Sequence, residues 1–192
     1  MTLNTGKISL KWKFTVVAAA QILFLAFIAF SRFWTIQAGE TVLLKTVPVD
    51  PRDLMMGDYV SLEYEINRLP AGIFQPEGAD ISRGVRPNKA VYVVLKPQGN
   101  YHVAAEAYLR KPSSLNPGEV LIKGKYLFGL DREVRVIYGI ERFYVPEGKG
   151  MEIERPPNQT GRQQLDVEVK VGTGGNAVIR RVFVNGEEMP FS

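Results

Sequence analysis

One long hydrophobic run sets the start of the chain apart from the rest, in which hydrophobic and polar residues mostly alternate. From Phe14 to Phe30 there is no charged residue, and only Thr15 and Gln21 are polar. With the aromatic residues at its ends, the run approaches the roughly 20 helical residues that cross a bilayer. The pattern predicts an N-terminal segment at residues 1–13, a transmembrane anchor at 14–34, a tether at 35–40 and a β-domain at 41–192.

The charges beside the hydrophobic run predict its orientation. Lys7, Lys11 and Lys13 precede it, whereas Arg32 alone lies at its other end. Because basic residues stay on the cytoplasmic side, we expect the N-terminus inside and the β-domain outside the cytoplasmic (inner) membrane. A cleaved signal peptide is an alternative, although the end of the run is too bulky for a small-residue cleavage site. A buried core helix is another, although the run has almost no polar face.

The segment after Gly57-Asp58 has the clearest strand pattern of the chain. Glycine accepts a positive φ and aspartate can bond its own nearby backbone, so this pair predicts a tight turn. The residues from Tyr59 to Asn67 then alternate, which predicts a half-buried strand. The side expected to face the core carries Val60, Leu62, Tyr64 and Ile66, and the other side carries Tyr59, Ser61, Glu63 and Glu65.

Short apolar segments bounded by Gly and Pro turns predict further strands, and Asn185-Gly186 is the strongest hairpin turn. The fold class expected is mainly β, an antiparallel sandwich or partly open barrel with one short helix, following the single N-terminal transmembrane helix. Residues 68–89 read as a long connection. The other strands expected are Thr41–Val47, Ala90–Lys96, Tyr101–Arg110, Val120–Phe128, Glu133–Val145 (bent at Gly139), Leu165–Val171, Ala177–Val184 and Glu187–Met189, and the helix is Glu147–Arg155.

The charge distribution argues against a nucleic-acid partner. The net charge is +4, but four basic residues and no acidic residue fall within the first 34 positions, and the remainder carries 20 of each sign. No concentrated basic stripe is visible in the sequence that would bind phosphates. The chain has no cysteine, which excludes disulfides, thiolate metal sites and a cysteine nucleophile.

No complete catalytic or metal-binding constellation appears in the sequence. His102 is the only histidine, and its place on a predicted strand favours a role in the sheet. The glycine-rich stretch from Gly172 to Gly175 precedes a strand and not a helix, so it predicts a hairpin turn and not a phosphate loop. We therefore expect no metal and no cofactor. Several carboxylates could serve acid–base chemistry if they converged in a pocket: Asp58, Glu63, Glu65, Glu141 and Glu147.

Gly57-Asp58-Tyr59, followed by Leu62 and Tyr64, resembles the signature of the GDYXXLXY domain family of bacterial membrane-anchored proteins. The stretches Tyr138–Gly148 and Ala177–Gly186 are also similar to that family, and the resemblance covers roughly residues 40–190. It implies one N-terminal hydrophobic segment and a multi-pass membrane protein as a partner. It carries no catalytic residue over. The motif positions to which we attach functional weight are Gly57, Asp58, Tyr59, Leu62, Tyr64, Glu141, Tyr144 and Glu147.

Three functions stay open at this level. The favoured one is a membrane-anchored extracytoplasmic β-domain that is not an enzyme and acts as an accessory or scaffolding protein on a multi-pass membrane partner. The second is a cell-envelope hydrolase or carbohydrate-binding enzyme that uses carboxylates near Tyr59, Tyr64 and Tyr144, because aromatic faces with flanking acids suit sugars. The third is an exported small-ligand sensor, which needs an apolar pocket in the β-domain.

Overall fold

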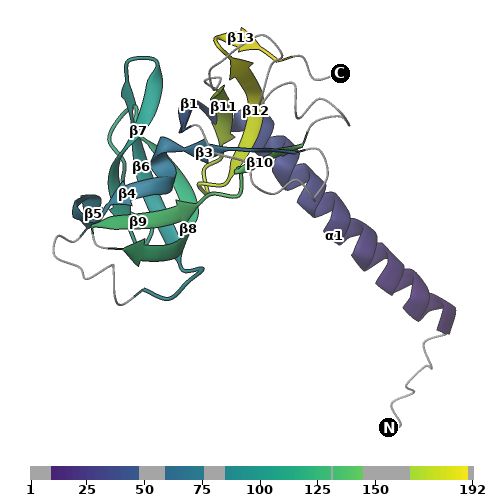
Figure 1. The fold of residues 1–192 in the computed structure, drawn as a ribbon. Helices are drawn as coiled ribbons and strands as arrows, with labels where there is room; N and C mark the ends of the chain where they lie inside the picture. The colour runs from purple at the N-terminus through teal and green to yellow at the C-terminus, as the bar shows by residue number, and fades with distance from the viewer. Residues whose placement is uncertain (1–9, 48–58, 76–84, 131, 145–164, 190–192) are drawn as a thin grey trace.

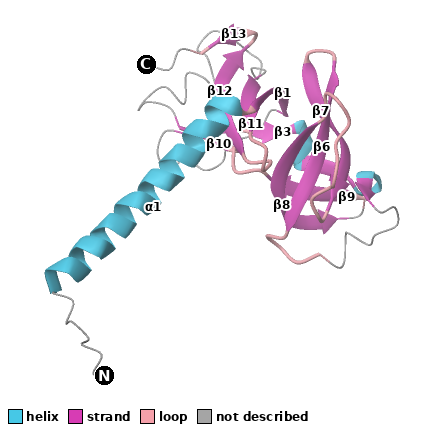
Figure 2. Ribbon diagram, turned by 180° about the vertical axis from the view of Figure 1, so that it is seen from behind, coloured by secondary structure: helices cyan, strands magenta, loops and turns pink. Residues whose placement is uncertain are grey.

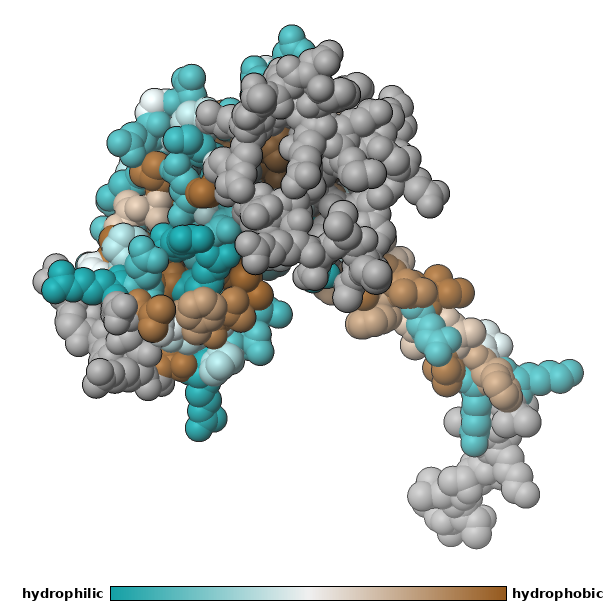
Figure 3. Space-filling model, in the orientation of Figure 1, coloured by the Kyte–Doolittle hydropathy of each residue, from teal (hydrophilic) through white to brown (hydrophobic). Residues whose placement is uncertain are grey.

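The N-terminal run forms one long helix that projects from a β-rich body (Figure 1). The structure, a computed structural model, describes residues 10–47, 59–75, 85–130, 132–144 and 165–189. Helix α1 (Leu10–Ala38) has 29 residues, so it is about 43 Å long against roughly 30 Å of bilayer hydrocarbon. Its stretch Lys11–Phe30 is long and apolar enough to cross a membrane, and none of that stretch is buried against the body. Hydrophobic side chains cover much of its surface (Figure 3).

The predicted tether is mostly helical. Helix α1 continues to Ala38, and strand β1 (Glu40–Val47) begins after Gly39 alone. The reason is local, because residues 35–38 contain no helix breaker and the first glycine after the hydrophobic run is Gly39. The Nζ of Lys170 donates a hydrogen bond to the carbonyl of Gly39 at 3.1 Å. The helix and the sheet are therefore joined directly.

Strand β1 belongs to a five-stranded antiparallel sheet in the order β13-β12-β11-β1-β3. The alternating pattern of the C-terminal segment produces β11, whose three buried valines face the core. The hairpin predicted at Asn185-Gly186 is confirmed, with both residues at positive φ. The other strands of this sheet are β3 (Glu63–Tyr64), β11 (Leu165–Val171), β12 (Ala177–Val184) and β13 (Glu187–Glu188).

A second sheet has six strands in the order β4-β9-β8-β6-β7-β5 and lies beside the first (Figures 1 and 2). All its pairs are antiparallel except β5 with β7, which is parallel. A two-stranded ribbon of β10 and β2 completes the body. The strands are β2 (Tyr59–Ser61), β4 (Arg68–Pro70), β5 (Phe74–Gln75), β6 (Ala90–Gln98), β7 (Tyr101–Tyr108), β8 (Val120–Leu130), β9 (Glu133–Ile137) and β10 (Arg142–Tyr144).

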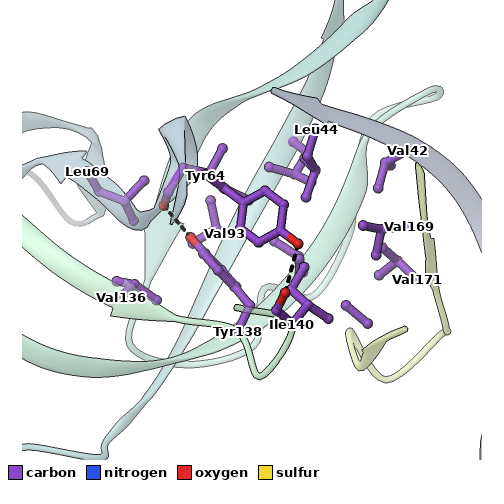
Figure 4. Close-up of a cluster of buried hydrophobic side chains, with 14 of the residues drawn as sticks. Val42, Leu44, Tyr64, Leu69, Val93, Val136, Tyr138, Ile140, Val169 and Val171 are labelled. Carbon is purple, nitrogen blue, oxygen red and sulfur yellow. Dashed lines mark hydrogen bonds between the residues drawn. The ribbon is translucent and has the colours of Figure 1, made fainter. Parts of the chain in front are cut away.

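Both sheets contribute to a single hydrophobic core, so the mainly β fold class is confirmed. Val42 and Leu44 of β1 face the side chains of β11, while Val93 and Val136 enter from the six-stranded sheet (Figure 4). Tyr64 lies between these two groups and is fully buried. A continuous core of this kind makes the β-domain one folding unit.

The segment Tyr59–Asn67 is not one strand, as the alternation predicted. It divides into β2, β3 and a 3₁₀ turn at Glu65–Asn67. The burial predicted from the alternation is nonetheless right where the structure describes it, because Leu62, Tyr64 and Ile66 are all buried. The break arises because β2 pairs with β10 while β3 pairs with β1, so the segment crosses from the ribbon to the five-stranded sheet.

Two other expectations need correction. The predicted strand Glu133–Val145 is broken at residues 138–141, where Gly139 has φ +81°, and its halves β9 and β10 pair with different partners. The expected connection at 68–89 contains two short strands, which bury Leu69 and Phe74. The helix expected at Glu147–Arg155 lies outside the described residues.

The middle of β8 is packed closely against its neighbours at Gly124. A Cβ at this position would meet Cγ1 of Val136, the carbonyl of Ile137 and Cδ1 of Tyr138, the last two at 3.0 Å. Gly72, in contrast, has no atom within 4 Å of a Cβ built on it. Only a residue without a side chain fits at Gly124.

We expect Gly124→Ala to lower the free energy of unfolding of the β-domain by about 1–3 kcal/mol, because overpacking displaces strand β9. Urea unfolding, monitored by far-UV circular dichroism, measures the change. Gly72→Ala is the matched control and should change stability by less than about 0.5 kcal/mol. Equal effects of the two substitutions would contradict this account of the β8–β9 contact.

Candidate functional site

The motif positions separate into three groups in the structure. Gly57, Asp58 and Glu147 lie outside the described residues. Tyr59 is in β2, where its backbone lies opposite that of Tyr144 in β10.

The remaining motif positions surround the crossing between β2 and β3. Leu62 and Tyr64 are buried in the core, Glu141 sits in the turn before β10, and the Tyr144 side chain is 71% exposed. The structure therefore brings Leu62, Tyr64 and Glu141 together and leaves the Tyr144 side chain at the surface.

Tyr64 and Tyr138, which we call the tyrosine pair, connect the two halves of this region through buried hydrogen bonds. The hydroxyl of Tyr64 donates to the carbonyl of Ile140 at 2.8 Å, and the hydroxyl of Tyr138 donates to the carbonyl of Ile66 at 2.7 Å (Figure 4). Each phenol thus donates to the carbonyl two residues after the other tyrosine. Each of the segments 62–67 and 136–141 therefore provides one hydroxyl donor and one carbonyl acceptor to the other.

Asn67 and Glu141 complete the connection with their side chains. The Oδ1 of Asn67 accepts the N–H of Tyr64 at 2.6 Å, and its Nδ2 donates to the carbonyl of Val136 at 2.8 Å. The same Nδ2 donates to Oε1 of Glu141 at 3.1 Å. Asn67 is 2% exposed, so each of these contacts satisfies a group that would otherwise be buried without a partner.

The carboxylate of Glu141 closes the turn that precedes β10. Its Oε1 accepts the N–H of Tyr138 at 2.5 Å, and its Oε2 accepts the N–H of Gly139 at 2.8 Å. Its backbone carbonyl accepts the N–H of Leu62 at 2.8 Å. An acidic side chain that bonds two backbone N–H groups stabilises a turn, as aspartate does in Asx turns. Glu141 therefore has a structural role in the described site.

The pKa values of three groups in or beside this region are shifted from their usual range. Burial, aided by the negative charge of Glu141, raises the pKa of Tyr64 and of Tyr138 well above the usual range, so both hydroxyls remain donors. Burial alone would raise the pKa of Glu63 as well. Hydrogen bonds from Arg135 at 2.5 Å and Arg68 at 2.9 Å outweigh it, and the pKa of Glu63 is lowered.

His102 lies away from the tyrosine pair, at the start of β7. Burial lowers its pKa, against a smaller opposing effect of the Glu40 charge. Its Nδ1 accepts the backbone N–H of Leu43 at 3.4 Å, so the neutral ring contacts β1 across the junction of the two sheets. This placement supports the role in the sheet expected from the sequence. No group of three or more His, Cys, Asp or Glu side chains among the described residues could hold a metal ion.

Two hollows lined by described residues are candidate ligand sites. One, of about 400 Å³, lies where α1 meets the body, and Trp34, Ala38, Gly139, Thr173 and Asn176 are among the residues that line it. The other, of about 600 Å³, lies beside the β8–β9 turn and is lined by Arg68, Phe128, Leu130, Arg132, Glu133, Val134 and Arg135. Neither is lined by Leu62, Tyr64, Glu141 or Tyr144.

Sequence reasoning missed Asn67 and Tyr138 as members of the site. Asn67 follows the last apolar residue of the alternating stretch, and a polar residue at such a position gives no sign that it is buried. Tyr138 precedes Gly139 within a stretch that resembles the family. This Tyr-Gly pair was the available sign in the sequence that Tyr138 belongs to the site. Both become important only through contacts with residues about 70 positions away in the chain.

We expect Tyr64→Phe and Tyr138→Phe each to lower the free energy of unfolding by about 1–3 kcal/mol, because each leaves a buried carbonyl without its donor. Chemical unfolding of the single variants and of the double variant measures the cost and the coupling. Tyr92→Phe, at a half-buried position of β6, is the matched control and should be close to neutral. A Tyr64→Phe protein as stable as the parent would contradict the proposed role of the pair.

Comparison with known proteins agrees with the signature in the sequence. No curated protein and no solved structure matches the chain. The family model described as "GDYXXLXY protein" matches residues 21–182, which include the second half of the apolar stretch Lys11–Phe30, all of the tyrosine pair and its partners, and strands β1 to β11. Because the match covers well over half of the 192 residues, the chain belongs to the GDYXXLXY family.

Proposed function

We propose that the chain is a single-pass protein of the cytoplasmic membrane whose β-domain lies outside, and that it acts as an accessory or scaffolding protein on a multi-pass membrane partner. The observation that carries the proposal is a polar side chain at the centre of the apolar helix. The direct connection between that helix and the β-domain adds support.

Gln21 lies near the middle of the stretch Lys11–Phe30, and its side chain is exposed in the isolated chain. Within the described residues its amide makes no hydrogen bond. Thr15, the other polar residue of the run, donates its hydroxyl to the carbonyl of Lys11 at 3.0 Å and is satisfied within the helix. An amide without a partner is unfavourable in hydrocarbon, so Gln21 favours contact with a polar group of another transmembrane helix.

The body can position such a partner because α1 is joined to it without a flexible linker. Gly39 alone separates α1 from β1, and its carbonyl is bonded to Lys170 of β11. The end of α1 also contacts β11 and β12. A partner bound to the helix would therefore meet the β-domain in a defined orientation.

Binding of a small ligand is a second candidate function, favoured by the hollow of about 400 Å³ beside Trp34. Its walls combine an indole with Thr173, Asn176 and glycine backbone, which suits a neutral polar ligand. A hydrolase that uses Glu141 is less well supported, because both oxygens of that carboxylate accept backbone N–H bonds.

We expect Gln21→Leu to weaken association with the partner by a few-fold to about 30-fold, the range for one hydrogen bond between helices. Crosslinking in membranes, followed by detergent purification of the full chain and mass spectrometry of multi-pass proteins, measures it. Thr15→Ala is the matched control, since Thr15 is bonded within its own helix. If no multi-pass protein is captured with the parent chain, or if both variants capture it equally well, the proposed docking is wrong.

The proposed orientation can be tested because the chain has no cysteine. A cysteine placed at the exposed Asn100, in the β6–β7 turn, should react with a membrane-impermeant maleimide in intact spheroplasts. A cysteine at Thr5, on the other side of the hydrophobic run, should react only after lysis. The reverse pattern would place the β-domain in the cytoplasm.

A further inference from the structure

Basic side chains gather where β8 pairs with the start of β6. Lys123 and Lys125 are exposed and alternate along β8 with buried residues, so both point outward from the sheet. Lys125 lies opposite Ala90, and the exposed Lys89 directly precedes that residue. Arg86, also exposed, lies in the turn that leads into β6. The N–H of Tyr126 donates to the carbonyl of Lys89 at 2.8 Å, so Lys89 and Arg86 stand at the end of the sheet, beside the outward-pointing Lys123 and Lys125. We call these four exposed residues the basic face.

The charge of the basic face is not neutralised within the part of the chain that the structure describes. None of its four cations takes part in an ion pair between described residues. Cations elsewhere on the body do have such partners: Lys45 lies 3.1 Å from Glu65, and Lys96 lies 3.2 Å from Glu119. The basic face is therefore available to an external anion.

Apolar side chains continue the same outward surface. Leu127, at the irregularity in the pairing of β8 with β9, is 38% exposed, and the neighbouring Phe128, which lies opposite Arg135, is 53% exposed. Lysines beside exposed leucine and phenylalanine are typical of surfaces that lie at a membrane interface, where the charges meet headgroups and the apolar groups enter the acyl boundary.

The basic face lies close to the place where the helix joins the body. The N–H of Lys123 donates to the carbonyl of Gly175 at 2.8 Å, in the turn whose flanking residues line the hollow together with Trp34 and Ala38. In Figure 1 the chain that enters β6, residues 85–89, runs along the lower edge of the body, on the side toward which α1 descends.

The length of the helix brings this edge near the bilayer. Eight residues of α1 follow Phe30, a rise of about 12 Å, whereas the headgroup layer on one side is roughly 5–8 Å thick. The body therefore begins within a few ångströms of the headgroups.

We propose that the basic face binds the anionic phospholipid headgroups of the leaflet from which α1 emerges. The inference rests on the proposed anchoring by α1 and not on the proposed protein partner. Each lysine near an anionic leaflet contributes roughly a fivefold factor to the association constant, and the attraction weakens as salt shortens the Debye length. The basic face and the helix together then set the orientation of the body on the membrane.

The test uses the full chain in lipid vesicles that contain no other protein. A cysteine at the exposed Pro87, beside the basic face, or at Asn100, at the other end of β6, carries a fluorescent donor, and the headgroups carry an acceptor. With phosphatidylglycerol present, we expect strong energy transfer from position 87 that falls as salt is added, and weak transfer from position 100. With phosphatidylcholine alone, transfer from position 87 should be weak.

Charge-reversal variants show whether the basic face is responsible. Lys125→Glu should lower the ratio of docked to undocked protein at least about fivefold, and Lys89→Glu combined with Lys125→Glu should lower it further. Gln98→Asp combined with Asn100→Asp, at the exposed far end of β6, changes the net charge equally and should leave the ratio within twofold. Circular dichroism of each variant confirms that the exposed substitutions leave the fold intact.

Several results would overturn the inference. They are equal transfer from position 87 in both lipids, an equal effect of the control substitutions at Gln98 and Asn100, or docking that appears only when membrane proteins are added, which would indicate an acidic protein surface. Flotation of the vesicles tests the anchor separately: a chain that does not float with them overturns both the anchoring and the basic-face inference. The energy-transfer experiment contains no other protein, so its result does not depend on whether a multi-pass partner is captured.

Discussion

Two phenol hydroxyls buried in one core must each find an acceptor, and this requirement organises the β-domain. Tyr64 and Tyr138 meet it by donating to the carbonyls of Ile140 and Ile66. An unsatisfied buried acceptor costs about 1–3 kcal/mol, a large part of the 5–15 kcal/mol by which a domain is stable. The bonds therefore specify one register between segments 62–67 and 136–141, which apolar packing alone would define less sharply.

The same region determines how helix α1 is joined to the body. Strand β1 leaves α1 after one residue and contributes Val42 and Leu44 to the core around Tyr64. It lies between β11 and β3, so the strand that follows helix α1 also pairs with the strand that carries Tyr64. Because β1, β8 and β11 share one core, the strand that follows α1 and the strand that carries Lys123 and Lys125 keep fixed positions relative to one another.

Local patterns in the sequence predicted those elements that local chemistry determines. The hydrophobic run gave the helix, the alternation in Leu165–Val171 gave β11, and Asn185-Gly186 gave a hairpin turn. The breaks at Leu62 and at residues 138–141 could not be predicted, because they depend on which distant strand each half pairs with. The basic face was missed for the same reason: Arg86, Lys89 and Lys125 are separated in sequence and come together only through the pairing of β6 with β8.

The family signature therefore indicates a fold more directly than an activity. Leu62 and Tyr64 have their side chains in the core, and Glu141 uses its carboxylate to close a turn. Residues with such roles are required by any protein that adopts this core, whatever it binds. Side chains that distinguish one binding surface from another must instead be exposed. Among the described residues, such exposed side chains include Gln21 in the helix, the walls of the hollow beside Trp34, and the lysines of the basic face, and the first two lie along or beside helix α1.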